Sequence, residues 1–275
     1  MNAAQHATPA IGSATTVLCL HSSASSARQW TPLVTALADS YRVITPDLIG
    51  YGAGSRPECP RALTLDEEAR RIEPLLAASQ GAAHLVGHSF GGAVALQIAL
   101  RNPGRIASIT LYEPVLFTLL DGEHRLRAES HEIRGVRAAV REALWRGEPE
   151  SAAQLFVDYW SGLGSWRALP AHRRESIVAR MPKVNAEFDA LFGSSPPASA
   201  YGRIVVPVQL MVGTLTRRPP RAVAARLAAL LPVVTRVEIG GAGHMGPLTH
   251  PDAVNAHIRT HLNAMAPAAQ IAQAA

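Results

Sequence analysis

The segment that most constrains the fold of this chain runs from Leu85 to Ala95 and reads Leu-Val-Gly-His-Ser-Phe-Gly-Gly-Ala-Val-Ala. It joins an apolar strand, a Gly-x-Ser-x-Gly turn and the start of a helix in direct succession. Glycines flank Ser89 because the turn is so tight that a Cβ atom would collide with the neighbouring strand or helix. The segment predicts a strand that passes straight into a helix, with Ser89 strained and exposed at the edge of a sheet.

Short β-branched runs alternate with longer helical patterns along much of the chain. Strands are predicted at Val17–Leu20, Tyr41–Thr45, Ala83–Val86, Ile106–Leu111, Val206–Val212 and Val234–Ile239. Helical spacing is found at Ala27–Ala38, Leu65–Ala78, Ala93–Asn102, Pro220–Leu231 and Asp252–Ala264. Continuously apolar strands suit a parallel sheet that helices cover on both faces. The pattern predicts an α/β fold with an open, doubly wound and mostly parallel sheet.

One stretch breaks this rhythm. Residues 117–201 show amphipathic helical segments and no convincing strand. We expect them to form a helical cap inserted into a core made of residues 1–116 and 202–265. The aromatic side chains of the cap either pack it onto the core or line a pocket. Residues 266–275 are rich in Ala and Gln, and we expect a flexible tail there.

Charge and targeting signals narrow the function classes. The net charge is +5, but Lys183 is the only lysine, and the arginines are scattered singly or in pairs. Without a basic run or a recognition motif, nucleic-acid binding is not expected. The start of the chain lacks a secretory pattern, and no apolar run is long enough to cross a bilayer. A cytoplasmic protein without stable membrane insertion is predicted, and its oligomeric state is unknown.

Taken together, the Ser89 segment and the alternating pattern resemble the α/β-hydrolase family from Val17 to about Leu262. His21-Ser22 is similar to the family's His-Gly loop, with Ser22 in place of glycine. The resemblance implies that the backbone N–H groups of Phe90 and Ser23 form an oxyanion hole. The loop from Asp47 to Ser55 resembles the family's Asp-x-x-Gly-x-Gly-x-Ser loop, which we interpret as structural.

A serine nucleophile needs a base, and the base needs a third group that holds its tautomer. The chain has 11 histidines. His244 lies in a Gly-rich loop after the last predicted strand, where the family places its catalytic histidine. We predict His244 as the base.

The acid is missing from its usual place. Most of the family has an aspartate after the penultimate strand, but this chain reads Gly213-Thr214-Leu215-Thr216 there. Thr216 cannot carry the negative charge, and we expect Thr216→Ala to do little. Some family members place the acid at the end of the strand before the cap, which points to Glu113. Two alternatives remain: Glu113 as a hinge carboxylate paired with an arginine, and a Ser-His dyad with water as third member.

The resemblance implies a serine hydrolase that cleaves a carboxylic ester, thioester or lactone through an acyl-enzyme intermediate. Neither a metal nor an organic cofactor is expected, and the partner is a small molecule with an apolar acyl or alcohol group. The same triad would also serve a carbon–carbon bond hydrolase, a perhydrolase or an acyltransferase. A non-enzymatic ligand receptor on the same fold is a further alternative.

Overall fold

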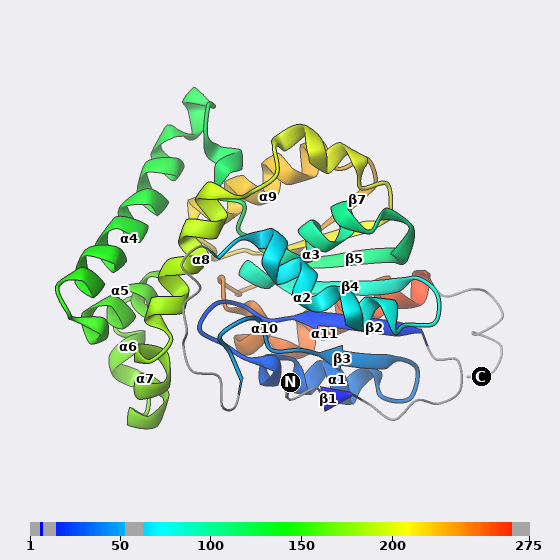
Figure 1. Ribbon diagram of the computed structural model, residues 1–275, viewed down its shortest axis with the longest axis horizontal. Coiled ribbons are helices and arrows are strands. Elements are labelled where there is room, and N and C mark those ends of the chain that lie inside the picture. Colours follow the sequence, from blue (N-terminus) through cyan, green and yellow to red (C-terminus); the bar gives the residue numbers. More distant parts are fainter. Residues whose placement is uncertain (1–5, 8–14, 53–62, 266–275) are drawn as a thin grey trace.

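The computed structural model describes residues 6–7, 15–52 and 63–265. Its centre is one twisted sheet with the strand order β1-β3-β2-β4-β5-β6-β7 (Figure 1). The strands are β1 (His6–Ala7), β2 (Thr16–Leu20), β3 (Arg42–Thr45), β4 (Ala83–His88), β5 (Ile106–Tyr112), β6 (Val208–Gly213) and β7 (Val234–Ile239). All neighbours are parallel except β1, which pairs antiparallel with β3 at the edge. The predicted doubly wound, mostly parallel α/β fold is confirmed.

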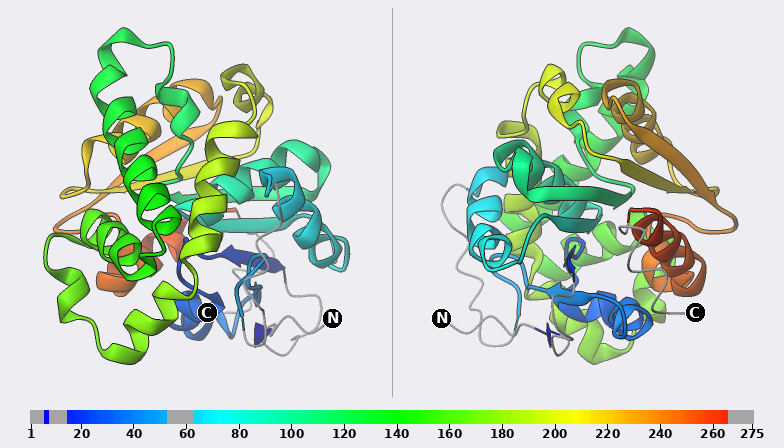
Figure 2. Two further views of the ribbon diagram at one scale, coloured as in Figure 1. Left: turned by 60° about the vertical axis from the view of Figure 1, so that its left-hand side comes forward. Right: turned by 90° about the vertical axis from the view of Figure 1, so that its right-hand side faces the viewer.

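Helices cover both faces of the sheet, as two separate clusters of buried side chains show. Leu18, Leu20 and Leu85 point to the face covered by α2 (Leu65–Ala77), α3 (Phe90–Arg101) and α9 (Arg218–Leu230). Their neighbours Val17, Cys19 and Val86 point to the face covered by α1 (Thr31–Leu37) and α11 (Pro251–Ala264). Figure 2 shows the cyan α2 and the red α11 on opposite sides of the sheet. This alternation along β2 and β4 is why consecutive apolar residues occur in both strands.

Residues 117–201 lie between β5 and β6 and form helices with no strand. The α-helices there are α4 (Arg127–Trp145), α5 (Pro149–Ser161), α6 (Ser165–Ala168), α7 (Ala171–Val178) and α8 (Met181–Gly193). They stand beside the sheet, on the left in Figure 1. We call residues 117–201 the helical segment. Its treatment as a separate cap stays a prediction.

The remaining helices are short. Gly246–Thr249 forms α10, and the 3-10 helices are η1 (Ala27–Trp30), η2 (Pro103–Arg105), η3 (Phe117–Leu120), η4 (His124–Leu126) and η5 (Ala198–Arg203). No helix in the described ranges combines the length and apolar character needed to cross a membrane. The expected tail at 266–275 and the end of the loop from Asp47 to Ser55 lie outside the described residues.

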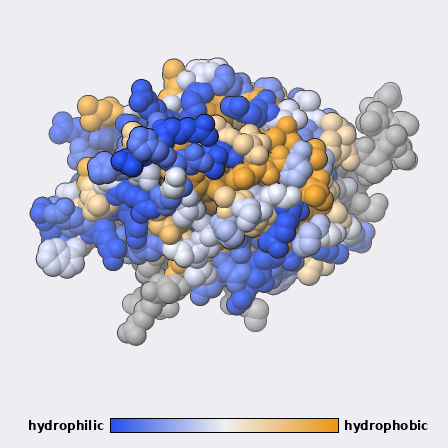
Figure 3. All heavy atoms as spheres, turned by 90° about the horizontal axis from the view of Figure 1, so that it is seen from above, coloured by the Kyte–Doolittle hydropathy of each residue, from blue (hydrophilic) through white to orange (hydrophobic). Residues whose placement is uncertain are grey.

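Hydrophilic residues dominate the surface around the helical segment, and hydrophobic residues form a band beside them when the molecule is seen from above (Figure 3). Several of the scattered arginines on this segment pair with nearby carboxylates, among them Arg134 with Asp121 and Arg137 with Asp189. The positive charge of the chain is thus partly balanced locally.

Candidate active site

The turn at Ser89 is as tight as the sequence predicts. β4 ends at His88 and α3 begins at Phe90, so Ser89 alone makes the connection, with φ +55° and ψ −119°. A Cβ atom on Gly87 would lie 2.7 Å from Gly91 O, and one on Gly91 would overlap the backbone of Leu20. The Ser89 N–H donates to Tyr112 O at 3.0 Å, which ties the turn to β5. A positive φ on a non-glycine residue is strained, and strain of this kind is typical of functional sites.

Three buried side chains from three different strand ends form a hydrogen-bonded chain. Ser89 Oγ lies 2.9 Å from His244 Nε2, and His244 Nδ1 lies 2.8 Å from Glu113 Oε2. Ser89 and His244 are each 5% exposed, and Glu113 is fully buried. The prediction that Ser89 is exposed is therefore wrong, because its side chain faces a cavity that the helical segment covers. The structure therefore brings together the three residues that the sequence singled out as nucleophile, base and acid. Within the described residues, Glu113 pairs with no arginine.

Glu113 is held by neutral donors. It follows β5 with a positive φ of 42°. The Gly213 N–H donates to Oε1 at 2.8 Å, and the Thr216 hydroxyl donates to Oε2 at 2.6 Å. Oε2 thus accepts hydrogen bonds from both Thr216 and His244.

Thr216 is the residue that sequence reasoning missed. It lies where most of the family carries an aspartate, and its hydroxyl reaches the carboxylate that comes from the other strand end. The signal that could have identified Thr216 was its place in the sequence, where the family usually has an acid that faces the catalytic histidine. Its replacement is now expected to be felt at the site.

The loop that carries His244 is fixed on two sides. Tyr112 Oη donates to Gly243 O at 2.7 Å. His88 Nε2 lies 2.8 Å from His244 O, and a carbonyl oxygen only accepts, so His88 carries its proton on Nε2. Burial lowers the pKa of His88 well below its usual value, and the nearby His244 lowers it further. His88 is therefore a neutral brace for the base.

The helical segment reaches the base directly. Trp160 on α5 lies with its ring centroid 4.0 Å from that of His244, at an interplanar angle of 32°. Of the aromatics whose role the sequence left open, Phe156, Trp160 and Phe188 line the cavity beside Ser89, whereas Trp166 is buried away from it.

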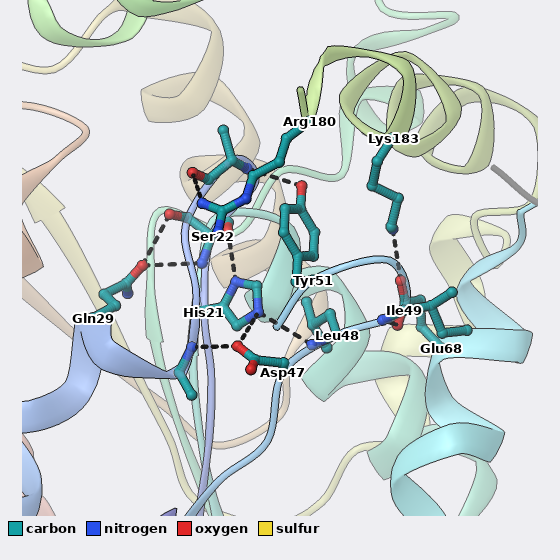
Figure 4. Close-up of polar contacts among 12 residues, drawn as sticks. His21, Ser22, Gln29, Asp47, Leu48, Ile49, Tyr51, Glu68, Arg180 and Lys183 are labelled. Atoms are coloured by element: carbon teal, nitrogen blue, oxygen red, sulfur yellow. Dashed lines mark hydrogen bonds and ion pairs between the residues drawn. The ribbon is translucent and has the colours of Figure 1, made fainter. Parts of the chain in front are cut away.

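The loop after β2 is held by His21 from below (Figure 4). The Leu48 N–H donates to His21 Nε2 at 3.1 Å, so the proton of His21 lies on Nδ1 and is donated to Ser22 O at 2.8 Å. Burial lowers the pKa of His21 to about 4, which keeps it neutral near pH 7. Because the Ser22–Ser23 peptide is trans, the Ser23 N–H points away from His21.

Two backbone N–H groups are available at this site. Phe90 is the first residue of α3, where no earlier carbonyl of the helix can accept its N–H. Neither Ser23 nor Phe90 donates its N–H to another group in the described part of the chain. Free N–H groups at a helix start favour a negative charge.

A cavity of about 380 Å³ opens over Ser89 and His244. The helical segment supplies an apolar wall that includes Phe117, Phe156 and Trp160, and the loop of residues 22–26 supplies a wall rich in serine. The volume is at the lower end of the range for small-molecule sites. No cluster of three or more His, Cys, Asp or Glu side chains in the described residues could hold a metal ion.

Comparison with known proteins agrees with this architecture. A family model described as "Alpha/beta hydrolase family" matches residues 17–257. A pimeloyl-[acyl-carrier protein] methyl ester esterase of Pectobacterium carotovorum is 28% identical over 240 residues, covering 87% of this chain and 91% of the esterase.

Two solved structures are similar in fold. The enol-lactonase from Burkholderia xenovorans LB400 superposes with a TM-score of 0.74 at 20% identity, covering 94% of this chain and 95% of the lactonase. A thermophilic esterase from Thermogutta terrifontis gives a TM-score of 0.73 at 23% identity, covering 95% and 93%.

Proposed function

Because this chain belongs to the alpha/beta hydrolase family, a family of hydrolytic enzymes, we propose that it is a serine hydrolase that cleaves a carboxylic ester, thioester or lactone. The observation that carries the proposal is the continuous hydrogen-bonded chain from Ser89 Oγ through His244 to Glu113, at 2.9 and 2.8 Å. A nucleophile, a base and an orienting carboxylate in this relation define acyl-transfer catalysis on many folds.

The protons at this site follow from its hydrogen bonds. The Glu113 carboxylate accepts a hydrogen bond from the Nδ1–H of His244. This tautomer leaves Nε2 unprotonated toward Ser89. His244 can then take the hydroxyl proton while Ser89 Oγ bonds to the substrate carbonyl carbon. Glu113 stabilises the imidazolium that forms.

The negative charge develops on the carbonyl oxygen. We propose that the N–H groups of Phe90 and Ser23 bind this oxygen, and that His21 holds the second donor by fixing the Ser22 carbonyl. Loss of one donor of this kind costs about 10²-fold to 10³-fold in turnover. The imidazolium then protonates the leaving group, an acyl-enzyme on Ser89 remains, and His244 activates water to release the acid.

The test is covalent labelling followed by turnover. A fluorophosphonate should label the protein at Ser89, and a p-nitrophenyl ester series of rising acyl length should be hydrolysed. Ser89→Ala should abolish both signals. Ser25→Ala is the matched control, since Ser25 lines the same cavity but lies outside the Ser89–His244–Glu113 chain, and it should still be labelled.

A folded sample that is not labelled would contradict the proposal and favour a ligand receptor. Labelling without ester turnover would move the assignment to a different reaction of the same nucleophile.

A further inference from the structure

The cavity over Ser89 carries an unbalanced positive charge. Its lining includes Arg28, Arg173 and Arg180 but no aspartate or glutamate. Arg28 and Arg173 are exposed at the rim, and Arg180 is half-buried beside the loop of residues 22–26. The cavity therefore has an apolar wall from the helical segment and, opposite it, a wall with positively charged side chains.

Several arginines elsewhere on the molecule have carboxylate partners, but among the described residues the cavity arginines do not. Outside the cavity, Arg217 pairs with Glu132 and Arg226 with Glu123. In the described residues, none of the three cavity arginines lies within ion-pair distance of a carboxylate. Guanidinium groups without a protein counter-charge, gathered at a cavity that holds a nucleophile, point to an anionic ligand.

Arg180 is the best placed of the three. Its Nη1 donates to Ala24 O at 3.2 Å, and its guanidinium lies 5.7 Å from the centroid of the Tyr51 ring (Figure 4). Tyr51 in turn accepts the Ala24 N–H at 2.9 Å. The loop thus holds the guanidinium one residue from Ser23, the proposed oxyanion donor. A guanidinium has five N–H donors, and only one is used in the described structure.

We propose that the substrate carries a carboxylate in addition to its scissile ester or lactone bond, and that Arg180 binds this carboxylate. Arg28 and Arg173 attract the anion at the rim, and the carbon chain between the two groups packs on the apolar wall. The inference rests on the proposed hydrolase function and adds the substrate class to it. A bidentate pair of guanidinium and carboxylate fixes orientation as well as affinity.

The experiment compares charged and neutral esters of matched shape. On the acyl side the pair is mono-p-nitrophenyl glutarate and p-nitrophenyl butyrate, and on the alcohol side it is 4-acetoxybenzoate and phenyl acetate. The readout is the ratio of kcat/KM for the anionic ester to that for the neutral one. The parent protein should prefer the anionic ester in at least one pair.

Arg180→Met should lower that ratio about 10-fold to 100-fold, as expected for the loss of hydrogen bonds to a charged group. Arg180→Lys should keep part of the preference, since it retains charge without the planar fork. Arg167→Met is the matched control: Arg167 is exposed on the same helical segment and does not line the cavity, so the ratio should stay at the parent value.

The neutral ester separates carboxylate binding by Arg180 from a purely structural role of its side chain. If Arg180 only positions the loop through Ala24, Arg180→Met would slow both esters equally and leave the ratio unchanged, which would overturn the proposal. No preference for the anion in either pair of the parent protein would overturn it as well. Failure of Ser89 labelling and of neutral ester hydrolysis would instead count against the proposed function.

Discussion

Two buried carboxylate sites in this protein are built in different ways. Glu113 receives its hydrogen bonds from neutral donors, the Gly213 N–H and the Thr216 hydroxyl, besides the ring of His244. Glu68 and Glu187 instead face the ammonium group of Lys183, at 2.8 and 3.0 Å. All these carboxylates are at most 1% exposed, so burial does not explain the difference.

The difference lies in where the compensating charge is kept. In the lysine site the charge is permanent, and it joins α8 of the helical segment to α2 beside the sheet. At Glu113 no fixed cation is present among the described residues, so its charge is available for the imidazolium that forms only during the reaction. The lysine site suits a permanent contact between two helices. The Glu113 site suits a carboxylate that stabilises a charge formed only during the reaction.

The largest effect that tests this contrast is expected for Glu113→Gln. The amide would place an NH₂ group opposite His244 Nδ1. An amide N–H cannot accept, so it favours the His244 tautomer with the proton on Nε2, facing Ser89. Turnover of a p-nitrophenyl ester should fall by about 10⁴-fold. The thermal midpoint should change little, because the Gly213 N–H still finds a carbonyl oxygen.

Thr216→Val is the control for the same oxygen. It removes one donor but leaves the charge and the His244 contact, so a loss of about 10-fold to 100-fold is expected. If Glu113→Gln stayed within about tenfold of the parent turnover, Glu113 would not be the acid, and the comparison would lose its catalytic half.

Lys183→Met should act on stability. It leaves Glu68 and Glu187 buried without their cation, and breaking a buried pair in this way costs about 3–5 kcal/mol in the free energy of unfolding. Denaturant unfolding would measure the loss. Arg146→Met is the matched surface control, since Arg146 pairs with Glu142 where both side chains are 58% exposed, and it should cost less than about 1 kcal/mol.

The triple variant Lys183→Met, Glu68→Gln, Glu187→Gln asks whether charge is the cause. With no ionised group left, much of the lost stability should return. A triple variant as unstable as the single one would show that the packing of the lysine stem matters more than its charge.

Sequence reasoning succeeded where chemistry is local and failed where it depends on packing. The strand-turn-helix at Ser89 is one continuous segment, whereas Glu113 was proposed from the family resemblance, which puts an acid after the strand beside the nucleophile strand. The hydroxyl of Thr216 meets Glu113 across 103 positions of sequence, and Lys183 meets Glu68 across 115. Such pairs can be predicted only once the sheet register and the position of α8 are known. The edge strand β1 was missed because a strand of two residues is too short to show an alternating pattern in the sequence.

His21 lies beside the lysine site and offers the last test. Its Nε2 accepts the Leu48 N–H, and the next N–H, that of Ile49, donates to Glu68 Oε2 at 3.1 Å. Burial lowers the pKa of His21 from 6.5 to about 4, against a hydrogen bond to Ser22 O and the nearby Asp47, which raise it.

Since the folded protein binds this proton less tightly than the unfolded chain, stability is intact above pH 6.5 and falls as the pH is lowered toward 4. The loss from His21 would reach about 3 kcal/mol. Long-range ¹H–¹⁵N spectra should show His21 as the Nδ1–H tautomer with a titration midpoint near 4, and His21→Gln would assign the signal. A midpoint near 6.5 would mean that burial does not hold His21 in its neutral form, and no loss of stability on acidification would then be expected from this residue.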